Sequence, residues 1–273
     1  MKKNVTVFLT RNAFFLYLLC CGYIFLTKVY AEQAGQVEVT HFSGDVEVLF
    51  KEADKYASVQ EGVLLEAGDK IKTGDASSAE LSFNEDNSNL VRLQADTEVV
   101  VILTDDEKLE MTAGEVFSSV SNLPSGSAFE IRTPTAVSGA RGTDWVTKVT
   151  EEGTDVEAIE SEPYVRHFEA DGTASKQRTM ITPGQMTTVR KFEKPAQFRP
   201  IADSRRQECR ALTQEVHKRA GEAIQKRQER PAFNRQDFLH QIKEQRQSSS
   251  QGKSEGSNAF DSGSQTDTTT RGK

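Results

Sequence analysis

Short runs of alternating apolar and polar residues fill the chain from Val37 to Val189, and Gly, Pro, Asn, Asp or Ser bounds each run. In one such run, Ala79, Leu81 and Phe83 are separated by Glu80 and Ser82. A period of two places successive side chains on opposite faces of a strand, so one face meets the core and the other water. The pattern predicts an all-β domain over residues 32–189. The run 99–103 is apolar on both faces, and we expect it to be the most buried strand.

A small residue followed by glycine precedes a strand at four places, which are Gly44, Gly68, Gly114 and Gly184. Glycine there allows the positive φ of a turn that directs the chain into the next strand. The four turns are unequally spaced, so they do not form a repeat of fixed length. We interpret them as corners of an irregular solenoid-like or rolled β domain, in which each turn covers the next.

The composition changes after Val189. Residues 190–202 contain two prolines and are expected to be a linker, and residues 203–247 a basic α-helical extension. Ser204 and Gln207 have the spacing of a capping box, and the helix is expected to stop by Arg230 because Pro231 follows. A second, shorter helix is expected over 235–247. Residues 248–273 are rich in Ser, Gln, Gly, Thr and Asp with little to bury, which predicts a disordered tail.

A narrow apolar stripe runs along the first of these helices. Its members recur every three or four residues, as on one face of a helix: Cys209, Leu212, Val216, Ala220 and Ile224. The stripe predicts either docking of the helix against the acidic β domain or a homodimer in which two copies pair as a coiled coil, with Cys209 near the contact.

The first 31 residues have the form of a secretory signal, with basic residues in front, an apolar run and small residues before the end. We expect cleavage between Ala31 and Glu32, and therefore a periplasmic or extracellular protein. The apolar run is shorter than the roughly 20 residues of a spanning helix. The membrane is expected as a partner only if this segment is retained as an anchor.

Charge divides the remaining chain into two parts. Residues 32–189 carry 30 Asp and Glu against 12 Lys and Arg, a net charge of −18, and residues 190–273 carry 18 Lys and Arg against 11 Asp and Glu, a net charge of +7. Charge runs of this kind most often only keep a surface solvated, which is the favoured interpretation, but an acidic body and a basic extension can also attract each other, another copy or an outside partner. Export argues against nucleic acid as that partner, so an envelope protein or polysaccharide is expected.

Residues that carry chemistry are sparse. Cys209 is the one thiol after the predicted cleavage site, and the four histidines are scattered with no ligand spacing, so we expect no catalytic residue, metal or cofactor. The acidic segments 84–89 and 105–107 offer oxygens for calcium but lack the ligand period of a calcium loop, and solvated hairpin tips are the favoured interpretation. Arg141, Thr143 and Trp145 form either an exposed recognition loop or, as favoured here, a strand end with Trp145 in the core.

Several of these segments resemble the FecR domain family when taken together and in order. That family runs from a G-D-x-I-x-T turn to a T-P-x-A segment and an R-G-T triplet followed by an aromatic residue. The matching segments here are 68–73, 109–116, 133–136 and 141–145. The resemblance extends over roughly residues 40–190, and it implies an all-β, solenoid-like envelope domain.

The family is named after periplasmic regulators of iron-citrate transport that signal to a sigma factor. Those regulators carry a cytoplasmic segment of many tens of residues before their membrane span, whereas about a dozen residues precede the apolar run here. We therefore expect an exported, non-enzymatic binding or scaffolding module. Two alternatives stay open: a signalling component of the iron-citrate type that works through a partner, and an enzyme acting on envelope polysaccharide.

Overall fold

The computed structural model describes residues 36–244 of the 273-residue chain. The predicted signal segment and its cleavage site, Ala31 and Glu32, lie outside these residues, as does the predicted tail 248–273. The described part has two nine-stranded sheets and two helices near its C-terminal end, and neither sheet closes into a barrel. The all-β prediction for the body is confirmed, while a solenoid-like coil stays a prediction.

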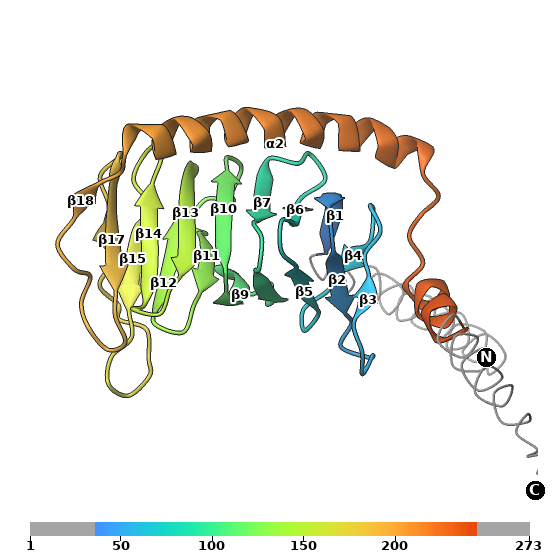
Figure 1. Ribbon diagram of the computed structural model, residues 1–273, viewed down its shortest axis with the longest axis horizontal. Helices are drawn as coiled ribbons and strands as arrows, with labels where there is room; N and C mark the ends of the chain where they lie inside the picture. The colour runs from blue at the N-terminus through green and yellow to red at the C-terminus, as the bar shows by residue number, and fades with distance from the viewer. Residues whose placement is uncertain (1–35, 245–273) are drawn as a thin grey trace, which may run out of the picture.

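The chain alternates between the sheets, so the strands of both advance in the same direction along the molecule (Figure 1). In spatial order the first sheet contains β18 (Arg199–Pro200), β17 (Gln185–Val189), β14 (Thr154–Ala158), β13 (Thr143–Val149), β10 (Glu115–Val120), β7 (Asn89–Leu93), β6 (Ser78–Ser82), β1 (Val37–Ser43) and β4 (Leu64–Leu65). The second contains β16 (Thr179–Met180), β15 (Tyr164–His167), β12 (Ala136–Ala140), β11 (Phe129–Arg132), β9 (Glu107–Ala113), β8 (Glu98–Val101), β5 (Lys70–Thr73), β2 (Val46–Leu49) and β3 (Ala57–Ser58).

Neighbouring strands are antiparallel except β9 and β11, which are parallel. The main core lies between the sheets: Trp145 of the first faces Phe129 of the second, with ring centroids 6.1 Å apart. Gly44, Gly68, Gly114 and Gly184 all have positive φ, so the predicted turns are confirmed. At Gly114 a side chain would also meet the backbone of Thr97 at 2.4 Å, so only glycine fits there.

The prediction of the most buried strand is wrong. In β8, Val99 and Val101 are buried while Val100 is half-buried. By contrast, every residue of β6 is buried, including the polar ones. The reason is that the outer face of the first sheet is covered by α2 (Asp203–Glu229), whose position the strand pattern did not indicate.

The long helix crosses the strands of the first sheet from β18 to β1 (Figure 1). The expected end is confirmed, because Arg230 is extended before Pro231. The expected capping box is wrong: Ala202 is the cap residue, without a side-chain hydrogen bond, and Ser204 lies inside the first turn. The expected linker also contributes β18, which pairs with β17. The second helix occupies residues 235–244 of the described chain.

Candidate functional site

The candidate functional site is the outer face of the first sheet together with the helix that covers it. We call this surface the acidic face and define it by five carboxylates from five strands: Glu38, Glu80, Glu115, Asp144 and Glu157. They share one face because they alternate along their strands with core residues such as Val39, Leu81 and Val156.

Small apolar side chains bring α2 close to this face. Cys209, Val216, Ala220 and Ala223 are buried, and Leu212 and Ile224 of the predicted stripe are half-buried. Cys209 packs in a small cluster with Phe117, Val146, Ile159 and Ile201, and Val216 and Ala220 pack on Leu90. The stripe therefore contacts the chain's own β domain, as the docking alternative required.

Arginines hold the first half of α2 to the acidic face. Arg205 donates from Nη2 to Glu115 at 2.6 Å and from Nε to Glu157 at 3.0 Å, so one guanidinium joins two strands. Two turns further, Thr213 donates its hydroxyl to Asp144 at 2.8 Å. The helix thus supplies a donor to three of the five carboxylates within its first eleven residues.

Glu80 is the most deeply buried carboxylate of the face, with 1% of its surface exposed. It accepts from Nη1 of Arg92, its neighbour on β7, at 2.7 Å and from Nε of Arg219 at 2.9 Å. Removing a carboxylate from water is costly unless opposite charge and hydrogen bonds compensate. One of the two compensating arginines belongs to the sheet and the other to α2.

The last turns of α2 meet the start of the β domain. Arg227 donates to Glu38 at 2.7 Å, to the amide oxygen of Asn87 at 2.9 Å and to the carbonyl of Glu85 at 2.6 Å. Asn87 in turn donates to the carbonyl of Ala220 at 2.8 Å. The predicted solvated tip at 84–89 is therefore corrected in part: Asn87 is buried against the helix, and α2 occupies this side of the loop.

A second contact, which we call the latch, lies beyond α2 and consists of Arg235, Phe238 and Leu239. Arg235 donates to the two oxygens of Asp69 at 2.7 and 2.6 Å and lies over the ring of Phe50, and Phe238 meets Phe50 edge to face at 5.8 Å. Phe238 and Leu239 join the main core. The end of the stack at β2 and β5 is thus closed by the chain's own C-terminal segment.

Asp69 is the aspartate of the predicted G-D-x-I-x-T turn and is fully buried. Its carboxylate also accepts from the backbone N–H of Lys51 at 2.9 Å and of Glu66 at 2.8 Å. A buried carboxylate with four donors, two of them from a bidentate arginine, is fully satisfied. The turn that identifies the domain in the sequence is therefore also the anchor of the latch.

Burial and charge alter the titration of groups at this interface. Burial raises the pKa of Glu157, although Arg205 opposes the shift. Burial lowers the pKa of Arg205, but the carboxylates of Glu115 and Glu157 raise it by more. Burial raises the pKa of the Cys209 thiol to about 11. The thiol is therefore protonated near neutral pH and is a poor nucleophile.

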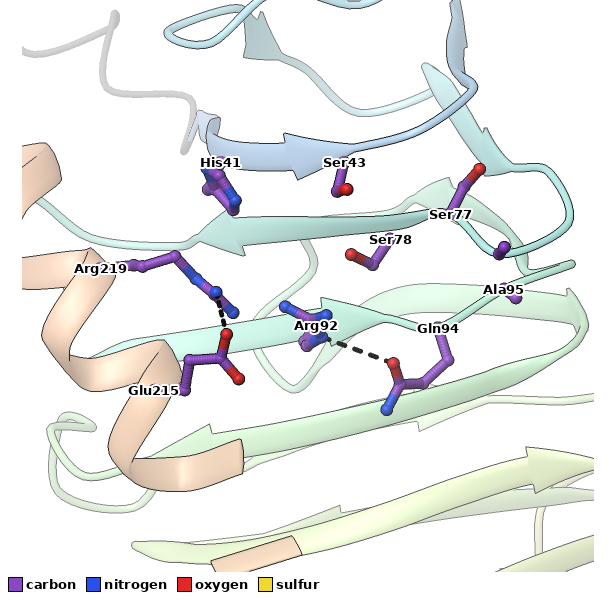
Figure 2. Close-up of a pocket in the computed structure, with 10 residues that line it drawn as sticks. His41, Ser43, Ser77, Ser78, Arg92, Gln94, Ala95, Glu215 and Arg219 are labelled. Atoms are coloured by element: carbon purple, nitrogen blue, oxygen red, sulfur yellow. Dashed lines mark hydrogen bonds and ion pairs between the residues drawn. The ribbon is translucent and has the colours of Figure 1, made fainter. Parts of the chain in front are cut away.

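A polar pocket of about 440 Å³ opens where α2 leaves part of the acidic face uncovered. Figure 2 shows Glu215 and Arg219 of α2 on one side, and Arg92 of β7 and Gln94, which follows β7, on the other. Its remaining lining is His41, Ser43, Ala76, Ser77, Ser78 and Ala95. Hydroxyl, amide and guanidinium groups dominate, so the pocket suits water or a small polar group rather than an apolar ligand.

The predicted recognition loop is divided by the structure. Trp145 is fully buried in the core, and the hydroxyl of Thr143 donates to the carbonyl of Glu160. Arg141 lies exposed in the turn between β12 and β13. The interpretation of Trp145 as a core residue agrees with this geometry, and the three side chains do not form one exposed surface.

A further buried carboxylate, Glu130 on β11, lies on the outer face of the second sheet. It accepts a hydrogen bond from the hydroxyl of Tyr164 and is paired with Arg166 and Arg178. Burial and this bond raise the pKa of Tyr164. Gly139 lies opposite Glu130, and a side chain there would meet Glu130 at 2.8 Å.

The four histidines, which the sequence analysis considered as candidates for chemistry, lie apart from one another. His41 bonds Glu61 at 3.0 Å, His217 bonds Ser119 at 2.9 Å, and the other two histidines lie elsewhere. Within residues 36–244 no group of three His, Cys, Asp or Glu side chains is arranged to hold a metal ion. The same residues include no helix with the length and apolarity needed to cross a membrane.

Sequence reasoning missed Glu38, Glu80, Asn87 and Arg235 as parts of an interface. The available signal was the charge contrast between body and extension, which predicted attraction but gave no pairing. Residues 133 to 189 positions apart form these bonds, and no local pattern specifies such partners.

Comparison with known proteins finds a family to which the middle of the chain is similar. The model of the family described as FecR protein matches residues 69–162. This match includes Asp69, Glu80, Glu115, Asp144 and Glu157 and ends before α2. The resemblance drawn from the turn motifs is confirmed over this segment. No curated protein matches the chain.

Two solved structures are similar to the chain, at 1.65 and 2.50 Å resolution, both of a proposed anti-sigma factor from Parabacteroides distasonis ATCC 8503. Each is 18% identical, with a TM-score of 0.38, over 48% of this chain. The chain spans 59% of the length of each of these proteins.

Proposed function

Because residues 69–162 carry the FecR family pattern, we propose that this protein is an exported, non-enzymatic binding module with a regulatory role that it exerts through a protein partner. The family match supports a role in signalling rather than in metabolism. Export is supported by the leader pattern of residues 1–31.

The non-enzymatic part of the proposal rests on the hydrogen-bond partners of the buried carboxylates. Five are buried among the described residues, and each is engaged by arginine or hydroxyl donors: Glu38, Asp69, Glu80, Glu130 and Asp144. A general acid or base needs a proton to exchange with substrate and a path to it. Carboxylates saturated by arginine and covered by protein suit a structural role.

Glu115 and Glu157 are two carboxylates of the acidic face that share one arginine. Both bind Arg205, and α2 lies over them. Hydrolysis of a glycosidic bond needs two carboxyl groups that flank the substrate, one of them free to donate a proton. This pair therefore provides the sharpest test between binding and catalysis.

The test compares four strains. One lacks the protein, one expresses the unchanged full chain, and two express the full chain with Glu115→Gln or with Glu157→Gln. We expect the deletion to change the transcript levels of a defined set of genes, and each folded Gln variant that still binds the partner to restore them, because neither carboxylate acts on a substrate. Cross-linking of the exported chain should recover one protein in near-stoichiometric amount. A folded Gln variant that fails to restore the transcripts while keeping that protein would contradict the non-enzymatic role.

The secretory prediction has its own measurement. Mass spectrometry of the exported protein should find Glu32 as the N-terminal residue. An intact terminus at Met1 or Lys2 would show that the segment is kept as an anchor and would place the β domain at a membrane surface.

A further inference from the structure

We propose that the acidic face is a docking surface for a basic helix of a partner protein, and that α2 occupies this surface as a tethered substitute which the partner's helix displaces. The inference rests on the proposed function as a protein-binding module, and it names the surface and the chemistry of the partner.

The contact between α2 and the acidic face combines small apolar side chains with ion pairs. The residues of α2 that are buried there are small, namely Cys209, Val216, Ala220 and Ala223. Around them, Arg205, Arg219 and Arg227 bind four of the five carboxylates of the face. The more exposed ion pairs of this contact weaken when salt screens the charges, the buried pair of Arg219 and Glu80 weakens less, and the apolar core between the sheets does not weaken.

The face itself specifies what can cover it. Its five carboxylates have two cations of the sheet as neighbours, with Arg92 beside Glu80 and Lys148 beside Glu115. An uncovered face would leave like charges on adjacent strands, which is unfavourable. A substitute for α2 must therefore be basic, and it must present small side chains at its contact so that its arginines can reach the sheet.

The attachment of α2 to the body differs at its two ends. At its start, β18 pairs with β17, and Ile201 is buried beside Cys209. At its end, residues 231–234 form no helix or strand and lead to the latch. The pocket lined by Glu215 and Arg219 leaves the middle of the helix incompletely enclosed (Figure 2). With the latch released, the far half of α2 would be held only by its own contacts with the sheet, among them those of Arg219 and Arg227, while its start stays fixed.

Competition by a synthetic helix tests this directly. The probe is a fluorescent peptide with the sequence of residues 203–229, added to the full chain at 50 mM NaCl and followed by anisotropy. In the Arg235→Ala variant the chain's own α2 competes less well, so we expect at least tenfold tighter binding than to the wild type. Binding should fall at 500 mM NaCl.

Two matched controls separate recognition from nonspecific attraction. The Arg141→Ala variant loses the same charge from an exposed turn, so it should bind the peptide as weakly as the wild type. A peptide with Arg205, Arg219 and Arg227 changed to Glu should bind neither protein. The proposal would be overturned if the Arg-to-Glu peptide bound the Arg235→Ala variant as tightly as the original peptide does. It would also be overturned if the original peptide did not bind the folded Arg235→Ala variant.

Hydrogen exchange of the unmodified chain decides the matter if Arg235→Ala does not fold. We expect the amides of α2 to exchange at least tenfold faster at 500 than at 50 mM NaCl, while those of β10 and β13 stay protected. If the amides of α2 exchange only together with those of β10 and β13, then α2 is a permanent part of the fold and does not leave the acidic face by itself. These measurements need no cellular partner, so they can succeed even if the transcript test of the proposed function fails.

Discussion

At the scale of the residue, buried charge carries most of the specificity of this fold. Asp69 illustrates it, because one carboxylate closes a turn through the N–H groups of Lys51 and Glu66 and also binds Arg235. Such a group stabilises the structure only while all its partners are in place, since each lost partner leaves a buried charge uncompensated.

Replacing Asp69 by Asn should therefore lower the free energy of unfolding by about 2–4 kcal/mol, because the amide cannot accept from all four donors and leaves Arg235 without its carboxylate. Urea denaturation measures the change. Asp105→Asn removes an exposed carboxylate and should shift stability by less than about 0.5 kcal/mol. A similar loss in both variants would show that the effect is one of net charge.

Two glycines should respond in opposite directions to alanine. At Gly139 the new methyl group would meet Glu130 at 2.8 Å and the carbonyl of Phe129 at 2.9 Å, so we expect a loss of about 1–3 kcal/mol. Gly221 lies exposed inside α2 with nothing within 4 Å, so alanine there should stabilise the protein by about 0.5–1 kcal/mol through helix propensity. Thermal unfolding of the two variants compares them directly.

Trp145 shows what sequence reasoning could and could not predict at this scale. The resemblance to the FecR family, which has an aromatic residue at this strand position, favoured a place for Trp145 in the core, and the structure buries it. Sequence reasoning kept an exposed loop of Arg141, Thr143 and Trp145 as an alternative, because a run of seven residues does not show what lies above each face. The bond from Thr143 to Glu160 joins residues that only the folded sheets bring together.

At the scale of the element, α2 connects the two halves of the sequence. Its apolar period was sufficient to predict Cys209, Val216 and Ala220 as one contact stripe, because spacing on a helix is local. Its direction across the first sheet depends on which arginine meets which strand, and this is a property of the assembled face. The wrong prediction that 99–103 is the most buried strand has the same origin, since burial of the outer face of the first sheet comes from a helix more than a hundred residues after β6.

Cys209 reports whether α2 is docked. It is 1% exposed, and with a pKa of about 11 roughly one thiol in a thousand is ionised at pH 8. Alkylation by iodoacetamide at pH 8 should therefore be at least a hundredfold slower in the folded chain than in 8 M urea. Fast alkylation of the folded protein would show that the helix spends much of its time away from the sheet.

The far end of α2 should respond to acid through Glu61. Burial raises the pKa of this carboxyl, but hydrogen bonds from His41 and Lys226 outweigh it and hold the pKa below the ordinary value of 4.5. A lowered pKa in the folded state means that the contribution of Glu61 to stability is present above about pH 4.5 and is lost as pH falls through the folded pKa.

The Glu61→Gln variant should accordingly be about 0.5–1 kcal/mol less stable than the wild type at pH 7 and equal to it near pH 3. Melting temperatures measured across this range give the comparison. Glu151→Gln, which changes an exposed carboxylate, should follow the wild type at every pH. A difference at Glu61 that persists at pH 3 would mean that packing rather than charge holds this end.

At the scale of the whole molecule, the division of charge between body and extension is realised within one chain. The sequence predicted attraction between an acidic part and a basic part but left open whether it acts within a copy, between copies or toward another protein. The structure places the extension on its own body through Arg205, Arg219, Arg227 and Arg235. A homodimer through the stripe would need those contacts to open first.

Shortening the chain should therefore reveal two opposite responses to salt. A chain that ends at Ile201 lacks α2 and the latch, so the carboxylates of the acidic face repel one another and Phe50 loses its cover. We expect its melting temperature at 50 mM NaCl to be lower than that of the full chain by on the order of 10 °C. Raising NaCl to 500 mM should recover part of that loss by screening the repulsion, while the full chain, whose ion pairs are weakened, should gain nothing.

A chain that ends at Gln247 keeps every described contact and should behave as the full chain does. If salt affects the shortened and full chains alike, the stability of the acidic face does not depend on charge compensation by the extension.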